Sequence, residues 1–338
     1  MAQHLSESIE TDRVQAALRA VLPPTAELAL IRVVGPVSEL RATGHRLRAR
    51  WVAEGWLRQV REVVTDKRRP DVVVARRMSP GAREALANAG VGWVDESGAA
   101  EIAIGTLVVA RSGRPDPPVQ KPTNWTPSVL AVAEALLCGV GGTVAAMESA
   151  TGLSTGSCTN ALRALTGLGL LAADAPRGRG AARRIVDADQ LLDAYASATR
   201  ALAPKESLQV GVTWHDPITE LAELGRELDA KSVAWAATGA VASMVLAPFL
   251  TTVSTTEIYV DARTPAQLDA VANRIGLRPI DGGRLTLRPF PTVSTRLFAE
   301  IADGLHVAPW PRVYADLRTT GVRGEEAAEH LWETIRDR

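Results

Sequence analysis

The stretch from residue 126 to residue 186 constrains the fold more than any other, because it holds three successive helix signals. Each signal opens on a hydroxyl side chain that can accept a hydrogen bond from a free backbone N–H group, at Thr126, Thr143 and Ser154. Pro127 fits the first turn of the first helix. Apolar residues follow at helical spacing in that helix: Val129, Leu130, Ala133, Leu136 and Leu137. We therefore expect three short helices.

A basic loop follows the third helix signal. Leu170-Leu171 indicates a short strand, residues 177–184 form an arginine-rich loop, and Ile185-Val186 returns as a second strand. Three short helices followed by a basic hairpin is the layout of a winged helix-turn-helix, a DNA-binding fold. Helical trios with a hairpin also serve as protein–protein modules, so that alternative stays open.

The third helix and the hairpin carry the side chains that we expect to contact DNA. They are Ser154, Thr155, Ser157, Thr159, Asn160 and Arg163 on the helix, and Arg177, Arg179, Arg183 and Arg184 on the hairpin. Asn160 is suited to adenine, and Arg163 is suited to guanine or phosphate. Arginines of the hairpin can reach the DNA backbone or the minor groove, although arginine-rich turns are often merely solvated. Two residues depart from the usual pattern: Glu148 on the second helix, and Gly156, which weakens the third by about 1 kcal/mol relative to Ala.

The rest of the 338-residue chain predicts an α/β (α+β) protein of several domains. A proline-rich linker, residues 112–125, separates an N-terminal α/β domain (residues 1–111) from the trihelical segment. Strand and helix patterns alternate again beyond that segment. We therefore expect a winged helix-turn-helix domain at residues 126–200 and a C-terminal α/β domain at residues 201–338.

The charge of the chain is balanced overall but unevenly distributed. Lys plus Arg and Asp plus Glu each number 38, so no global attraction to nucleic acid is expected. Residues 1–80 hold 14 basic against 9 acidic side chains, whereas residues 201–338 hold 14 against 18. This asymmetry permits a basic face toward DNA and an acidic rear, but solvated surfaces alone would also produce it.

The N-terminal domain contains a partial match to a nuclease motif. Pro70-Asp71 ahead of a strand is similar to the first half of the PD-(D/E)xK pattern, in which acidic groups hold a metal and a Lys assists the attacking water. The fitting second half, Glu101-Ile102-Ala103, has Ala in place of that Lys. Asp71 and Asp95 are better interpreted as turn residues at strand ends. We expect at most a degenerate nuclease-like fold.

No other pattern indicates catalysis, a metal or a cofactor. The five histidines are scattered and the two cysteines, Cys138 and Cys158, lack the spacing of metal ligands. Thr238-Gly239 at a helix start could bind a phosphate, but close packing of a strand on a helix explains this glycine better. We therefore expect a protein that is not an enzyme, with buried cysteines in a reducing compartment.

One uncharged stretch raises a membrane alternative. No charged residue lies between Lys231 and Glu257, and that length could span a bilayer. The stretch contains Gly239 and Pro248 and is rich in Ala, Ser and Thr, whereas a spanning helix is mostly strongly apolar. We expect a buried strand, helix and loop instead. Because the N-terminus carries no signal peptide, we expect a cytoplasmic protein without a membrane partner.

Several short motifs follow one another in a particular order. The central run extends from Thr143 to Ser154 and is followed by 161–165 and 169–171. The flanking motifs lie at 90–98, 189–195, 235–240, 258–260, 313–317 and 323–329. This order resembles the AbiEi-like antitoxins of type IV toxin–antitoxin systems from about residue 71 to the C-terminus. The resemblance implies a DNA-binding autoregulator whose toxin partner, where present, is a nucleotidyltransferase.

These features predict a sequence-specific transcriptional regulator that binds double-stranded DNA. We expect a homodimer that places its two third helices in successive major grooves of a repeated operator. One alternative is an antitoxin-like protein-interaction module that neutralises a toxin partner through its acidic C-terminal domain. The other is an active metal-dependent nuclease, whose cleavage would depend on Asp71.

Overall fold

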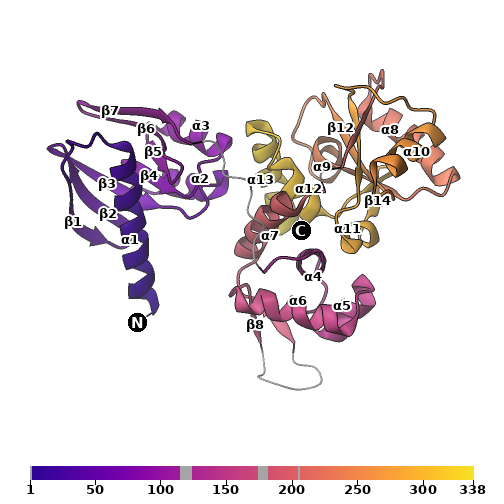
Figure 1. Cartoon of the computed structure of the whole chain (residues 1–338), viewed down its shortest axis with the longest axis horizontal. Helices are drawn as coiled ribbons and strands as arrows, with labels where there is room; N and C mark the ends of the chain where they lie inside the picture. Colours follow the sequence, from indigo (N-terminus) through magenta and orange to yellow (C-terminus); the bar gives the residue numbers. More distant parts are fainter. Residues whose placement is uncertain (1, 115–123, 174–181, 205) are drawn as a thin grey trace. The chain divides into compact units, whose positions relative to one another are not determined.

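The chain forms two compact units, Met1–Pro118 and Val119–Arg338. The computed structural model describes residues 2–114, 124–173, 182–204 and 206–338, with side chains from residue 8 onward. Within these residues the chain forms thirteen helices and three sheets (Figure 1). The predicted mixed α/β fold class is therefore confirmed.

A seven-stranded sheet forms the centre of the N-terminal unit. Its strands lie side by side in chain order: β1 (Leu28–Val34), β2 (Val37–Ala42), β3 (His45–Trp51), β4 (Val72–Ala75), β5 (Gly92–Asp95), β6 (Ala99–Ile104) and β7 (Leu107–Ser112). Strands β3, β4 and β5 run parallel, and the other neighbours are antiparallel. The helices of this unit are α1 (Ala2–Val21), α2 (Leu57–Thr65) and α3 (Pro80–Ala89).

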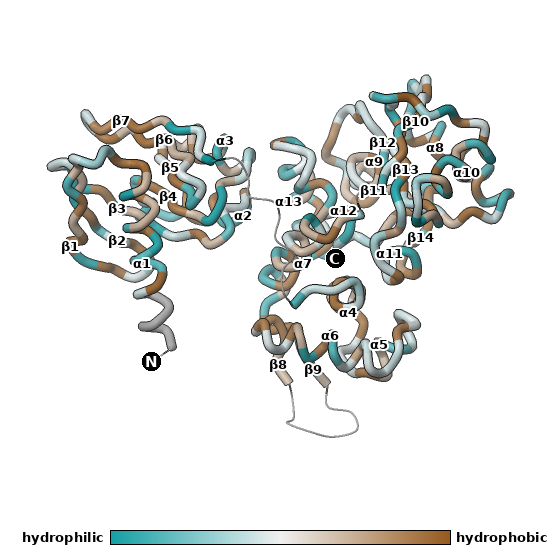
Figure 2. The backbone as a smooth tube through the Cα atoms, in the orientation of Figure 1, coloured by the Kyte–Doolittle hydropathy of each residue, from teal (hydrophilic) through white to brown (hydrophobic). Residues whose placement is uncertain are grey.

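Helices cover both faces of this sheet around β4. Val72 and Val74 belong to a core that includes Val14 and Leu18 of α1. Val73 belongs to a second core, which is formed with α2 and α3. Successive side chains of a strand point to opposite faces. Because both faces are covered here, all four residues of β4 are buried, and Figure 2 colours this strand as hydrophobic. A strand buried on both faces needs this continuous apolar run.

A six-stranded mixed sheet belongs to the second unit. Its order is β10 (Leu208–Val210), β13 (Leu285–Pro289), β12 (Thr256–Val260), β11 (Trp235–Thr238), β15 (Leu305–Val307) and β14 (Glu300–Ala302). The pairs β12–β13 and β11–β15 are parallel, and the others are antiparallel. The helices around it are α7 (Ala188–Leu202), α8 (Pro217–Ala230), α9 (Gly239–Leu246), α10 (Pro265–Arg274), α11 (Val293–Leu297), α12 (Trp310–Leu317) and α13 (Val322–Arg336).

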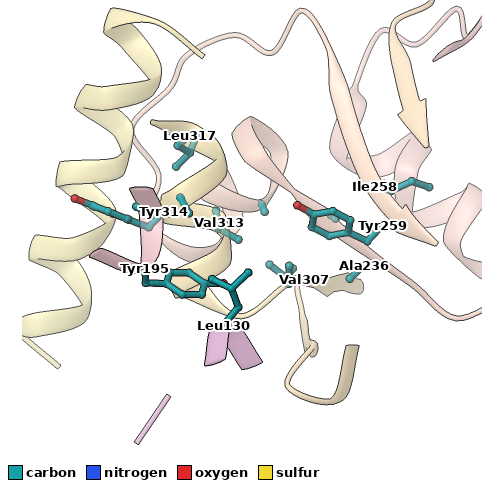
Figure 3. Packing of buried hydrophobic residues seen from close by; sticks show 14 of the residues in the cluster. Leu130, Tyr195, Ala236, Ile258, Tyr259, Val307, Val313, Tyr314 and Leu317 are labelled. Carbon is teal, nitrogen blue, oxygen red and sulfur yellow. The ribbon is translucent and has the colours of Figure 1, made fainter. Parts of the chain in front are cut away.

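Helix α12 carries charged side chains into the core of this unit. The carboxylate of Asp316 accepts hydrogen bonds from Thr238 at the end of β11 (2.6 Å) and from Tyr259 of β12. Arg312, one turn earlier on α12, donates to the same carboxylate through Nε (3.1 Å) and Nη2. Burial alone would raise the pKa of Asp316, but Arg312 and Arg288 outweigh it and the pKa is lowered. The buried pair therefore consists of two ions. Figure 3 shows the Tyr259 ring extending from the sheet toward this helix.

The uncharged stretch before Glu257 forms ordinary core elements. It contains β11, α9 and the loop that leads into β12. None of the described helices combines the length and the apolar composition needed to cross a membrane. The packing interpretation of Gly239 was wrong: its φ angle is 61°, and apart from its chain neighbours and its own helix no atom lies within 4 Å of the position that a Cβ would take. The glycine is favoured here by its left-handed backbone.

Replacing Asp316 with Ala should lower the free energy of unfolding of the second unit by about 3–5 kcal/mol, because Arg312 would stay buried without its charge partner. The double variant Arg312→Met/Asp316→Leu removes both ions and should lose much less. Urea unfolding followed by circular dichroism compares the two. Equal losses would show that lost packing, rather than an unpaired charge, determines the cost.

Candidate nucleic-acid interface

Three short helices form where the sequence predicts them. They are α4 (Pro127–Leu137), α5 (Val144–Thr151) and α6 (Thr155–Gly167). The hydroxyl oxygens of Thr126, Thr143 and Ser154 accept hydrogen bonds from backbone N–H groups of the first turns at 3.3, 3.1 and 3.2 Å. These bonds satisfy donors that a helix start leaves without a partner. Each helix therefore begins at a position determined by its own sequence.

The inward side of α6 fixes this helix against the other two. Its buried residues are Cys158, Ala161, Leu162 and Leu165. They share a core with Leu130 of α4 and Met147 of α5, and Figure 3 shows Leu130 beside Tyr195 of α7. Gly152 ends α5 with a φ angle of 67°, and only two residues then lead into α6. The opposite side of α6 consequently faces solvent.

A short hairpin is fastened to the loop between α4 and α5. Its strands are β8 (Leu171–Ala173) and β9 (Arg183–Ile185), which pair antiparallel. The backbone N–H of Arg183 also donates to the carbonyl of Gly142 at 3.0 Å. A Cβ at position 142 would lie 1.9 Å from the carbonyl oxygen of Arg183, so only glycine permits this approach. The sequence interpretation missed Gly142, although the Gly-Gly pair ahead of Thr143 is a visible signal.

Asn160 and Arg163 are two of the expected DNA-contacting residues on α6. Both are exposed, and the guanidinium Nη1 of Arg163 donates to Oδ1 of Asn160 at 3.0 Å. Residues three positions apart lie on the same side of a helix. The pair therefore forms one polar surface with several free donors. Thr159 is half-buried beside it.

The hydroxyl residues at the start of α6 are already engaged within the protein. Ser154 caps the helix and donates to Ser157 Oγ at 3.0 Å. Thr155 donates to the carboxylate of Glu148 on α5. Short polar side chains commonly bond to nearby groups in this way. The carboxylate of Glu148 thus lies next to the N-terminus of α6, where an approaching phosphate would be repelled.

The hairpin arginines differ in their accessibility. Arg184 is exposed on β9, whereas Arg183 is half-buried and its backbone holds the hairpin to Gly142. Arg177 and Arg179 lie outside the described residues. The structure thus brings Arg184 and the Asn160–Arg163 pair into one three-helix and hairpin assembly.

The residues of the partial nuclease motif are engaged in the N-terminal sheet. Asp71 accepts from the backbone N–H of Arg48 (2.8 Å) and from its guanidinium Nη2 (3.1 Å). Asp95 is fully buried and accepts from the backbone N–H groups of Ser97 (2.9 Å) and Ala99 (3.2 Å). In the parts of the chain that the structure describes, no three His, Cys, Asp or Glu residues are grouped to hold a metal ion. The Asp71 carboxylate thus connects the start of β4 to β3, and the Asp95 carboxylate stabilises the turn between β5 and β6.

Glu134 joins the three-helix assembly to the rest of its unit. This carboxyl group lies on α4 with no exposed surface and accepts from Thr292 (2.9 Å) and Thr295 (3.0 Å) at the start of α11. Ser294 also donates to the carbonyl of Ala131 on α4 at 2.8 Å. Burial raises the pKa of Glu134 to about 7, against the opposing effects of Arg312 and the two threonine hydrogen bonds. The helix α4 is therefore held to α11 by a group that titrates near neutral pH.

Stability should consequently fall as pH rises from 4.5, the ordinary pKa of Glu134, to about 7, its folded value. In this window the unfolded chain releases the proton while the folded chain still binds it, and the total loss is on the order of 3 kcal/mol. The variant Glu134→Gln should lack this fall. Urea unfolding across the pH range measures it, with Glu223→Gln as an exposed control. Identical pH profiles for wild type and Glu134→Gln would contradict the assignment.

Comparisons with known proteins leave the family of this chain open. No family model, curated protein or solved structure was found to match it. The resemblance to AbiEi-like antitoxins therefore stays a prediction. Any assignment of function rests on the geometry of the three helices and the hairpin.

Proposed function

We propose that residues 126–186 form a winged helix-turn-helix and that the protein is a sequence-specific DNA-binding transcriptional regulator. The observation that carries this proposal is the exposed Asn160–Arg163 pair on α6. The pair stands on a helix whose inward side is fixed by its core residues. A rigid helix that presents amide and guanidinium groups to solvent is suited to the major groove.

The two side chains offer complementary chemistry for reading base edges. An Asn amide can donate to and accept from adenine, and an Arg guanidinium can donate twice to guanine or to a phosphate. Their mutual hydrogen bond at 3.0 Å orients both side chains before binding. Side chains that are already ordered lose less entropy when a complex forms. Arg184 on the hairpin can add a phosphate or minor-groove contact.

The arrangement of the complex follows from the size of one reading helix. A single helix contacts only a few base pairs, so we propose a homodimer on a repeated operator with two α6 helices in successive major grooves. The chain has no net charge. Attraction to DNA must therefore come from local groups such as Arg163 and Arg184 rather than from the whole surface.

A second candidate is an antitoxin-like interaction module that neutralises a nucleotidyltransferase-type toxin. Its support is the acidic excess of residues 201–338, which hold 18 acidic against 14 basic side chains. An acidic surface can direct association with a basic partner. Co-purification of a toxin, together with an absence of DNA binding, would favour this candidate.

The variant Asn160→Ala should lose preference at one base pair of the operator, worth about 1–3 kcal/mol. Replacing Arg163, Arg177 and Arg179 with Ala should weaken DNA binding. The magnitude of the slope of log affinity against log salt concentration should decrease by about one for each lost phosphate contact. The operator is first selected from random duplexes, and gel shifts at several salt concentrations then measure affinity. The control Arg226→Ala removes an exposed arginine of α8. Unchanged affinity and preference in these two variants, which we call the α6 variants, would contradict the proposal.

The variant Glu148→Gln should bind DNA more tightly than wild type. It removes the negative charge beside the start of α6 and keeps an oxygen for Thr155. The expected gain is roughly two- to fivefold at low salt, corresponding to about 0.5–1 kcal/mol for an exposed charge interaction, and it should shrink as salt rises. Fluorescence anisotropy with the selected duplex measures it, and Glu223→Gln serves as control. Unchanged affinity would place Glu148 away from the DNA, and a loss of affinity would show that its carboxylate does not oppose binding.

A further inference from the structure

One face of the N-terminal sheet carries a row of charges that neutralise one another from β1 to the residue before β4. Arg32 of β1 pairs with Glu39 of β2 at 2.7 Å. Glu39 stands opposite Arg48 of β3, and Arg48 pairs with Asp71 just before β4 at 3.1 Å. Positive and negative groups alternate along the row, as stable cross-strand pairing requires.

The next row on the same face has no such compensation. Arg41 of β2 stands directly opposite Arg46 of β3, and both side chains are exposed. Like charges in directly opposed positions destabilise a sheet. Among the described residues neither arginine forms an ion pair, because both carboxylate oxygens of Glu39 in the neighbouring row accept from Arg32. After the hydrogen bond from Arg32, Arg46 makes only a smaller contribution to the lowered pKa of Glu39. The fold therefore tolerates a repulsion that the adjacent row avoids.

Three more cations lie at the same end of the sheet. Strands β3 and β4 are parallel, so the residues ahead of β4 lie at the end where β3 begins. Lys67, Arg68 and Arg69 occupy this position, and all three are exposed. Their backbone is ordered by Asp66, whose carboxylate accepts from the N–H of Arg68 (2.9 Å) and whose carbonyl accepts from the N–H of Arg69 (3.1 Å). A tight turn thus presents three successive basic side chains.

We propose that Arg41, Arg46, Lys67, Arg68 and Arg69 form a second DNA-binding site, the basic end of the sheet, which binds the phosphate backbone. Guanidinium groups bind phosphate oxygens in pairs, and the bound anions offset the repulsion between Arg41 and Arg46. Duplex DNA supplies a regular series of phosphates that matches cations spread over two strands and a turn. The choice of DNA as ligand rests on the proposed function, but the basic end belongs to the other compact unit and acts without α6.

The site adds affinity without adding sequence preference. Phosphate contacts position a protein on DNA but carry no base information. Because both sites belong to one chain, binding at α6 raises the effective concentration of DNA at the basic end. The proposed regulator thus reads bases with α6 and gains general affinity from its N-terminal unit.

The test compares two triple variants of the full chain that lose the same charge. The first, Arg46→Ala/Lys67→Ala/Arg68→Ala, removes cations of the basic end. The matched control, Arg19→Ala/Arg32→Ala/Arg76→Ala, removes exposed arginines of the same unit, two of which are ion-paired. Binding to a fluorescent duplex of random sequence is measured by anisotropy over a salt series. Affinity decreases with salt, and the magnitude of the slope of log affinity against log salt measures the number of phosphate contacts. This magnitude should decrease by about 2.7 in the first triple, at about 0.9 per phosphate contact, and by less than about 1 in the control.

Each outcome separates this proposal from the proposed function. Equal salt slopes in the two triples, or no change of slope in the first, overturn the proposal that the basic end binds DNA, whatever the α6 variants show. A reduced slope in the first triple supports it even where the α6 variants bind normally. A first triple that keeps DNA binding but loses binding to poly-glutamate assigns the surface to acidic protein segments and also overturns it. The single variant Arg46→Ala checks folding, because relief of the repulsion should raise its thermal unfolding midpoint.

Discussion

The carboxylate of Asp316 accepts hydrogen bonds from three parts of the second unit. Thr238 comes from the end of β11, Tyr259 from β12, and Arg312 from the helix α12 itself. In a medium of low dielectric constant such bonds are strong, and the loss of one partner is costly for those that stay. These bonds therefore fix the position of α12 relative to the sheet. Glu134 in the same unit holds α4 to Thr292 and Thr295 at the start of α11, and the charge of Arg312 opposes the rise of its pKa. The position of α4 thus depends on a polar group buried deep inside its unit.

Local signals predicted the starts of the helices because capping is a local interaction. Thr126, Thr143 and Ser154 each accept a bond from an N–H group three residues further along. The polar network could not be predicted in this way. Glu134 and Thr292 are 158 residues apart, and Thr238 and Asp316 are 78 apart. No periodicity of the sequence indicates which distant partner a buried charge will have, since that depends on how the elements pack.

The candidate site shows the same division between local and long-range information. The apolar spacing of α6 indicates which side faces inward, and this places Asn160 and Arg163 outside. The involvement of Thr155 with Glu148 depends on the turn between two helices and was not foreseen. The basic end was equally hidden, because the sequence shows an excess of cations in its first eighty residues but not that Arg41 and Arg46 become cross-strand neighbours.

The contact between Gly142 and Arg183 has a consequence for how a protein of this design can change. The base of the hairpin is held by a backbone hydrogen bond from Arg183 to Gly142, which is possible only because position 142 has no side chain. The outward side chains of α6 have no part in that contact or in the core beneath them. Under the proposed function, shape and binding preference are therefore encoded at separate positions. Descendants of such a chain could then exchange residues 160 and 163 to acquire new targets while the scaffold stays the same, whereas a substitution at position 142 would alter the scaffold for every target at once.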